Sequence, residues 1–315
     1  MGGSNRKKIL VAVDGSNESI STVDYVTKVV PPAQTEVTLF HVFSKIPEAF
    51  WDVEKSRESD LWMEKIKALE VGHEKAVRTF MKNARQTFLD NNFREQFLKI
   101  EVQNRVRGIA RDILAESRRD YDMLVMGSRG TSQLYGVTIG SITNKVLGTL
   151  SSLPICVVAG HPNIQNIMVA MDGSESSMRA VDYICASLNG VKREIILFHA
   201  MRRIGFPESS KVKANPFEEI EKAVWEETKK LIEPSMEKAR KQLADAGLND
   251  DDIILRIVTG VPSRAKALIE EAKNANCGSI IVGRTGISRV EDFNIGRVCQ
   301  KVLHRAKDIA VWVVP

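Results

Sequence analysis

The chain has 315 residues, 43% hydrophobic and 27% charged, a composition typical of globular proteins and long enough for two cores of about 150 residues each. No apolar run approaches the ~20 residues of a membrane-spanning helix, and the opening MGGSNRKK lacks a signal peptide's apolar segment, so we expect a cytoplasmic protein without a membrane partner. The net charge of +5 is mild, and acidic residues are interleaved with basic ones, which disfavours a nucleic-acid partner.

Strands alternate with helical patterns along the first half of the chain. Apolar runs predict strands at about 8–13, 36–43, 96–102, 122–126 and 154–158. A helix after Ser16 should turn Ile20, Val23, Val26 and Val30 inward, and a longer helix at about 56–90 should do the same with Trp62, Ile66, Leu69, Val77 and Phe80. This alternation favours β-α-β units and a parallel sheet covered on both faces.

A glycine-rich segment follows the strand at 122–126. Residues 127–141 read GSRGTSQLYGVTIGS, with four glycines and no acidic side chain. A strand, a glycine loop and a helix in this order point backbone N–H groups at an anion, although such a loop alone is weak evidence.

The whole pattern then recurs. ILVAVDGSNESISTVDYV at 9–26 corresponds to IMVAMDGSESSMRAVDYI at 167–184, and MLVMGSRG at 123–130 corresponds to SIIVGRTG at 279–286. The chain is therefore one module used twice. The turn-forming segment AGHPNIQ at 159–165 separates the two copies, so we place the domains at 1–160 and 161–315.

These motifs resemble the nucleotide-binding type of universal stress protein. The resemblance lies in the VAVDGS start, the LFHV second strand and the spacing G-x-x-G, nine residues, G-S formed by Gly127, Gly130, Gly140 and Ser141. It implies an α/β fold of two tandem doubly wound domains, each a five-stranded parallel sheet of order 3-2-1-4-5 flanked by helices. It also implies ATP, with or without Mg²⁺, bound at the carboxyl edge of the sheet. That edge is where ligands enter open α/β sheets, at the switch between strands one and four.

The expected site combines strand ends with the glycine loop. Gly127 and Gly130 should let the backbone approach the ribose and first phosphates, and Gly140 and Ser141 should present helix-terminal N–H groups and a hydroxyl to the outer phosphates. By resemblance, Asp14 lies near the ribose or adenine and Val42 packs on the adenine; the alternative for Asp14 is a turn or cap residue. The candidate nucleotide-binding residues are Ala12, Asp14, Val42, Met126, Gly127, Arg129, Gly130, Gly140, Ser141 and Ile142.

The second copy departs from this pattern. It keeps Asp172, Gly283, Gly286 and Gly296, but Ala200 replaces Val42 and Arg297 replaces Ser141. Its loop also carries Arg289, Glu291 and Asp292, whereas the first loop is uncharged at 131–139. We favour Arg297 pairing with one of these carboxylates, which would weaken a second nucleotide site; the alternative is that Arg297 holds a phosphate.

Two other functional classes stay open. Slow ATP hydrolysis or phosphotransfer would need a positioned base, yet the sequence has no Walker, H-R-D or D-F-G motif. His41 and His199 lie in apolar strands, which favours a structural role. The second class is an interaction module that needs no nucleotide. Isolated Cys and His residues give no metal cluster.

The expected partners are an adenine nucleotide, a protein that the sequence does not identify, and other sheet edges. The last strands, 154–158 and 310–314, are apolar edge strands, which tend to be paired. By resemblance to the family's dimers, these edges should pair and make the chain an intrachain pseudo-dimer, which could associate further as a homodimer.

Overall fold

The computed structural model describes residues 6–44, 59–130, 139–187, 193–204, 218–287 and 294–315. It divides into two compact units: residues 1–28 with 32–150, and residues 29–31 with 151–315. The sequence repeat placed the boundary at 160/161, whereas the compact units divide earlier in the chain because the strand that ends the first repeat belongs to the second unit.

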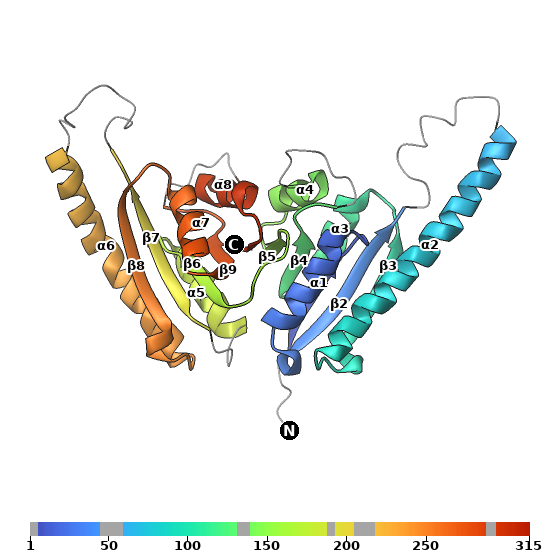
Figure 1. The fold of residues 1–315 in the computed structure, drawn as a ribbon, viewed down its shortest axis with the longest axis horizontal. Coiled ribbons are helices and arrows are strands. Elements are labelled where there is room, and N and C mark those ends of the chain that lie inside the picture. The colour runs from blue at the N-terminus through green and yellow to red at the C-terminus, as the bar shows by residue number, and fades with distance from the viewer. Residues whose placement is uncertain (1–5, 45–58, 131–138, 188–192, 205–217, 288–293) are drawn as a thin grey trace. The chain divides into compact units, whose positions relative to one another are not determined.

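The first unit is built from alternating strands and helices. Its strands are β1 (Lys7–Ala12), β2 (Thr35–Phe43), β3 (Leu98–Asn104) and β4 (Met123–Gly127), and its helices are α1 (Asn17–Val29), α2 (Ser59–Asp90), α3 (Ile109–Ser117) and α4 (Ser141–Thr149). The strands are parallel, and β1 lies between β2 and β4. Figure 1 shows α2 running along β3 and β2, with which it makes contact.

The second unit repeats this order. Its strands are β5 (Ile155–Val158), β6 (Asn166–Ala170), β7 (Ile195–Arg202), β8 (Ile253–Val261), β9 (Cys277–Gly283) and β10 (Ala310–Val314). Its helices are α5 (Glu175–Ser187), α6 (Glu218–Asp245), α7 (Arg264–Asn274) and α8 (Arg297–Arg305). Helices α5 and α6 pack together, and so do α7 and α8.

The predicted doubly wound fold is confirmed. The strand order is β3-β2-β1-β4-β5 in the first repeat and β8-β7-β6-β9-β10 in the second, which is 3-2-1-4-5 in both. Parallel pairing joins the strands of each unit, except that β5 pairs antiparallel with β10, with Cys156 opposite Trp312. The predicted pairing of these two edge strands is therefore present.

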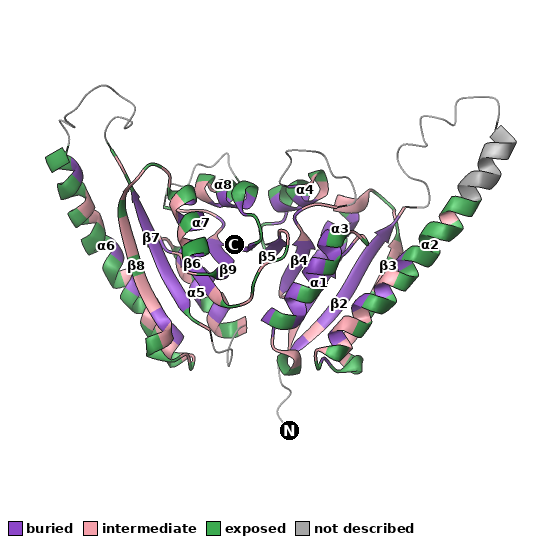
Figure 2. Ribbon diagram, viewed as in Figure 1, coloured by how far each residue is buried: buried purple, intermediate pink, exposed green. Residues whose placement is uncertain are grey.

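The central strands supply the core. Figure 2 shows buried strands and helices whose outward faces are exposed, as expected for a sheet covered on both sides. Val23, Val26 and Val77 are buried as predicted. The inward orientation expected for Ile20 and Leu69 is wrong, since both are more than half exposed; an apolar residue at roughly helical spacing can still fall at the rim of the buried stripe.

Candidate functional site

The site predicted from the glycine loop lies at the carboxyl edge of β1 and β4. Ala12 at the end of β1 is paired with Met126 in β4, and both side chains are buried. The chain leaves these neighbouring strands in opposite directions around the sheet, toward β2 and toward β5. This is the switch point at which an open α/β sheet has a crevice.

Asp14 organises the turn that leads from β1 into α1. Its Oδ1 accepts hydrogen bonds from the Ser16 backbone N–H at 3.0 Å and from the Ser19 hydroxyl at 2.7 Å, and its own N–H donates to Ser19 Oγ at 2.9 Å. Asp14 therefore has the turn and cap role that the sequence offered as one of its two alternatives. This role leaves Oδ2 directed toward the glycine loop, where a Cβ on Gly130 would lie only 2.5 Å from it.

Protein groups occupy the space beside the first two loop glycines. A Cβ at Gly127 would lie 3.1 Å from the Arg129 carbonyl oxygen and 3.2 Å from Glu18 Cβ in α1. These positions therefore need glycine for close packing of the loop on Asp14 and α1. Packing within the protein is thus sufficient to require glycine here, whereas the sequence pattern assigns these glycines to the close approach of ribose and phosphates.

Gly140 and Ser141 open α4, as predicted. Gly140 is the N-cap residue, has no side chain to accept from the first-turn N–H groups, and is followed by a first turn without an acidic residue. The Gly140 N–H donates to the Ser128 carbonyl at 2.7 Å, and the Thr143 hydroxyl donates to the Gly127 carbonyl at 2.9 Å. These bonds hold the start of the helix against the end of β4, with Ser141 exposed and Ile142 partly exposed.

An ion pair between a buried carboxylate and a partly exposed guanidinium lies at the loop. The Glu18 side chain is only 8% exposed, and its Oε1 lies 3.0 Å from Nη2 of Arg129. Within the described part of the chain, Glu18 Oε2 is buried without a hydrogen-bond partner. Arg129 was a predicted site residue, but Glu18 was missed. The sequence signal that could have identified Glu18 is its position: it is an acidic residue in the first turn of a helix that begins at the switch point.

The end of β2 lies next to β1. Val42 is buried, and the preceding His41 donates from Nδ1 to the Val13 carbonyl, an N···O distance of 2.8 Å. His199 makes the same bond to the Met171 carbonyl at 2.6 Å. Burial lowers the pKa of both imidazoles, which keeps them neutral. Both histidines tie strand ends together, which supports the structural role expected for them.

The second unit reproduces the scaffold but not the charges. Asp172 accepts from the Ser174 N–H at 3.0 Å, and a Cβ at Gly286 would lie 2.6 Å from Asp172 Oδ2. Gly296 is the N-cap of α8, and Arg297 is its exposed first residue. Ser176 stands where the first unit has Glu18, close to Gly283. Arg289, Glu291 and Asp292, the proposed partners and neighbours of Arg297, lie outside the described residues.

A cavity of about 340 Å³ opens at this second loop. It is lined by Gly173, Ser174, Glu175, Ser176, Thr285, Gly286 and Ile287. Glu175 is exposed and lies 3.7 Å from the Arg179 guanidinium.

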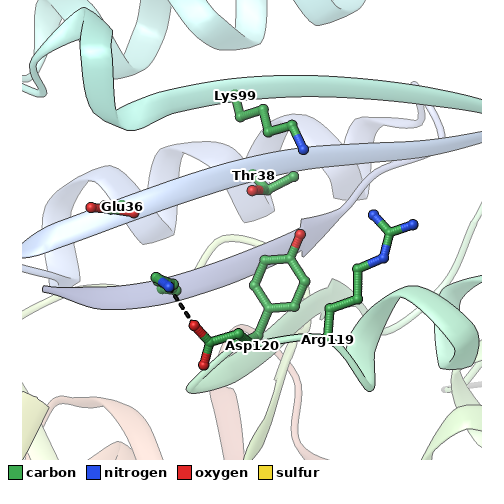
Figure 3. Close-up of a pocket in the computed structure, with 7 residues that line it drawn as sticks. Glu36, Thr38, Lys99, Arg119 and Asp120 are labelled. Atoms are coloured by element: carbon green, nitrogen blue, oxygen red, sulfur yellow. Dashed lines mark hydrogen bonds and ion pairs between the residues drawn. The ribbon is translucent and has the colours of Figure 1, made fainter.

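A smaller polar cavity of about 200 Å³ lies at the opposite, amino-terminal edge of the first unit (Figure 3). Each of its cations has a carboxylate partner: Lys8 pairs with Asp120, Lys99 with Glu101, and Arg119 with Glu116. Burial, with the nearby Glu116, raises the pKa of Tyr121 to about 12, so the phenol stays protonated. These compensated charges make a surface network without an evident ligand chemistry.

The described residues also bear on other classes of function. They contain no group of three or more His, Cys, Asp or Glu side chains placed to hold a metal ion. None of the described helices combines the length and the hydropathy that crossing a bilayer requires.

Comparison with known proteins agrees with the geometry. The model of the universal stress protein family matches residues 5–158 and again residues 163–315. A universal stress protein of Mycolicibacterium smegmatis is 25% identical over 98% of this chain and 97% of its own length. The universal stress protein YxiE of Bacillus subtilis is 29% identical over 43% of this chain and 89% of its own.

A solved structure extends the likeness to the fold of the whole chain. The crystal structure of a universal stress protein from Archaeoglobus fulgidus superposes with a TM-score of 0.57 at 19% identity, covering 99% of this chain and 98% of that one.

Proposed function

The chain belongs to the universal stress protein family, and from that premise we propose that it is an ATP-binding stress-response protein whose first unit holds the nucleotide. The base would lie at the end of β2 beside Val42, and the phosphates would lie over the glycine loop and the start of α4. Nucleotide occupancy would then set the shape or the choice of a protein partner. The proposal also keeps the intrachain pseudo-dimer and a cytoplasmic location as expectations.

The observation that carries the proposal is the start of α4. A helix whose N-cap is glycine presents first-turn N–H groups with no capping side chain. Those groups and the positive end of the helix dipole favour an anion. The loop beside them is held on Asp14 and on the end of β4, at the switch point of the sheet. A preformed anion site at that position suits a nucleotide phosphate.

Binding, with at most slow turnover, is the chemistry that these residues support. The ionisable side chains described beside the loop are already engaged: Asp14 with Ser16 and Ser19, and Glu18 with Arg129. A general base must reach its proton at hydrogen-bond distance, and these two carboxylates serve the fold. We propose ATP hydrolysis far below the ~10 s⁻¹ median of dedicated enzymes.

Calorimetry of the full chain with MgATP tests the function. A Cβ at Gly140 meets only ordinary contacts, the nearest at 3.4 Å, and the Gly140 φ of −66° suits any residue. Gly140→Val should therefore fold and yet lose ATP binding, because the branched side chain covers the helix start. Gly148→Val, on the same helix with no neighbour within 4 Å, should bind normally. No heat from the unaltered chain at millimolar ATP would sink the proposal.

The slow-turnover claim has its own test. Ordinary steady-state hydrolysis that is lost in Asp14→Ala, while ATP affinity is kept, would show that the chain is an enzyme.

A further inference from the structure

The two units differ at the first residue of one corresponding helix. In the first unit, α3 begins at Ile109 behind the N-cap Gly108. In the second, α7 begins at Arg264 behind the N-cap Ser263. Both helices follow the third strand of their repeat, and both begin at the carboxyl edge of the sheet. An apolar side chain in one unit is therefore a cation in the other.

Arg264 reaches the end of the second strand of its unit. Its Nε donates to the Ala200 carbonyl at an N···O distance of 3.3 Å. Ala200 follows His199 as Val42 follows His41, and the two histidines make equivalent bonds to Met171 and Val13. Ala200 and Val42 thus occupy the same place in the fold. In the first unit, this place is where the proposed function puts the base.

The position of Arg264 is electrostatically costly. A cation in the first turn of a helix opposes the helix dipole at a cost of about 0.3–1 kcal/mol. The Ala200 carbonyl supplies a hydrogen-bond acceptor for the Arg264 guanidinium. Arg264 is exposed, and this hydrogen bond places its guanidinium beside the end of β7.

The loop end of the second unit, by contrast, is not closed by the residues that are described. The 340 Å³ cavity lies there, lined by Ser174, Ser176, Thr285 and Gly286, and its described lining has no counterpart of the Glu18–Arg129 pair. Within the described residues, the base position is where the second unit carries a charge that the first unit lacks.

We propose that Arg264 is a specificity-determining residue that closes the base position of the second unit, so that an adenine nucleotide occupies the first unit alone. This rests on the proposed function of the first unit. Arg264 occupies the backbone acceptor at the strand end and places a charged, hydrated group where a flat apolar base would pack. Ile109 leaves the corresponding place in the first unit apolar.

Reciprocal substitutions in the full chain test the proposal by titration calorimetry with ATP. The unaltered chain should bind one ATP. Arg264→Ile should add a second site, and Ile109→Arg should weaken the first site at least tenfold. Lys266→Ile removes a neighbouring exposed cation of α7 that pairs with Glu270 and should leave one site. Ile109→Leu should keep the first site. A thermal melt of each variant checks the fold.

The outcomes distinguish the role of Arg264 from the proposed function of the first unit. One site in both the unaltered chain and Arg264→Ile, with full affinity kept in Ile109→Arg, would overturn the role of Arg264 and leave the proposed function standing. A second contrary outcome is two ATP sites in the unaltered chain, one of which is lost in Arg264→Ile. Arg264 would then be a nucleotide ligand, and its proposed role in excluding nucleotide would be overturned. No ATP binding by any of the variants would overturn the proposed function, and this inference with it.

Discussion

At the scale of single residues, Asp14 shows how one side chain serves both fold and site. Its Oδ1 caps the turn into α1, while the loop glycine Gly130 packs against its Oδ2. The sequence offered these as alternatives, a cap or a ligand residue. The structure makes them compatible, because a carboxylate has two oxygens and the cap engages the one facing α1.

Gly130→Ala should disturb this arrangement. Its Cβ would lie 2.5 Å from Asp14 Oδ2, so Asp14 must move and its turn hydrogen bonds weaken, at a cost of about 1–2 kcal/mol of unfolding free energy. ATP affinity should fall with it. Gly148→Ala, with no neighbour within 4 Å inside α4, should instead stabilise by about 0.5–1 kcal/mol. Denaturant unfolding measures both; an unaltered stability of Gly130→Ala would contradict the packing role.

The Glu18–Arg129 pair makes a second residue-scale prediction. Arg129→Ala should lower the free energy of unfolding by about 2–3 kcal/mol, because it leaves a buried carboxylate without its cation. Adding Glu18→Gln should restore part of this loss, since a neutral amide is cheaper to bury. Lys28→Ala breaks the exposed Lys28–Asp24 pair of α1 and should cost less than about 0.5 kcal/mol. If the changes in the free energy of unfolding of the Arg129 and Glu18 substitutions simply add in the double variant, the two side chains do not stabilise each other.

Burial of His41 and His199 predicts acid sensitivity. The pKa of each is lower in the folded chain than its ordinary value, first because of burial. Between the folded value and the unfolded value near 6.5, the unfolded chain binds more protons, so stability is lost as the pH falls below about 6.5. Each tenfold difference in proton affinity corresponds to about 1.4 kcal/mol. Unfolding curves at pH 7.5 and 5 should show a smaller loss in the His41→Asn, His199→Asn double variant.

At the scale of elements, the segment between the two repeats is fixed to the second unit. The Asn163 carbonyl oxygen lies so close to the start of β9 that a Cβ at Gly278 would be 1.6 Å from it. The Asn163 side chain also donates to Asn276 Oδ1 at 3.1 Å. The turn signals at 159–165 predicted a linker, and the structure shows that this linker packs on its neighbour.

Gly278→Ala should therefore displace the linker. The added methyl group cannot coexist with the Asn163 carbonyl, so residues 159–165 should become open to proteases. Limited proteolysis followed by mass spectrometry should find cleavage there. Gly72→Ala in α2, which has no neighbour within 4 Å, is the matched control. Equal protease resistance of the two variants would show that the linker is held elsewhere.

At the scale of the molecule, the repeat in sequence and the compact units in space do not coincide. β5 ends the first repeat, yet it belongs to the second unit and pairs antiparallel with β10. An apolar edge strand such as β10, which carries the buried Trp312, tends to pair with other chains when it is left bare. β5 covers that edge.

A fragment of residues 151–315 should therefore be more stable and less prone to aggregate than one of 161–315, because only the first keeps β5 on β10. Light scattering after size-exclusion chromatography and thermal melts compare the two fragments. If both are equally monomeric and equally stable, β5 is dispensable for the second unit.

The sequence by itself determined the repeat, the alternation of strands and helices, and the opening of α4 by Gly140 and Ser141, because apolar periodicity and glycine placement are local signals. The strand order was implied by the family resemblance of these motifs. Only the tertiary structure decided which groups meet. Glu18 beneath Arg129, Gly130 against Asp14 and Arg264 over Ala200 join residues from different elements. Tertiary packing also decided the exposure of Ile20 and the assignment of β5 to the second unit. Burial and edge pairing both depend on which elements the rest of the chain places next to a residue or strand.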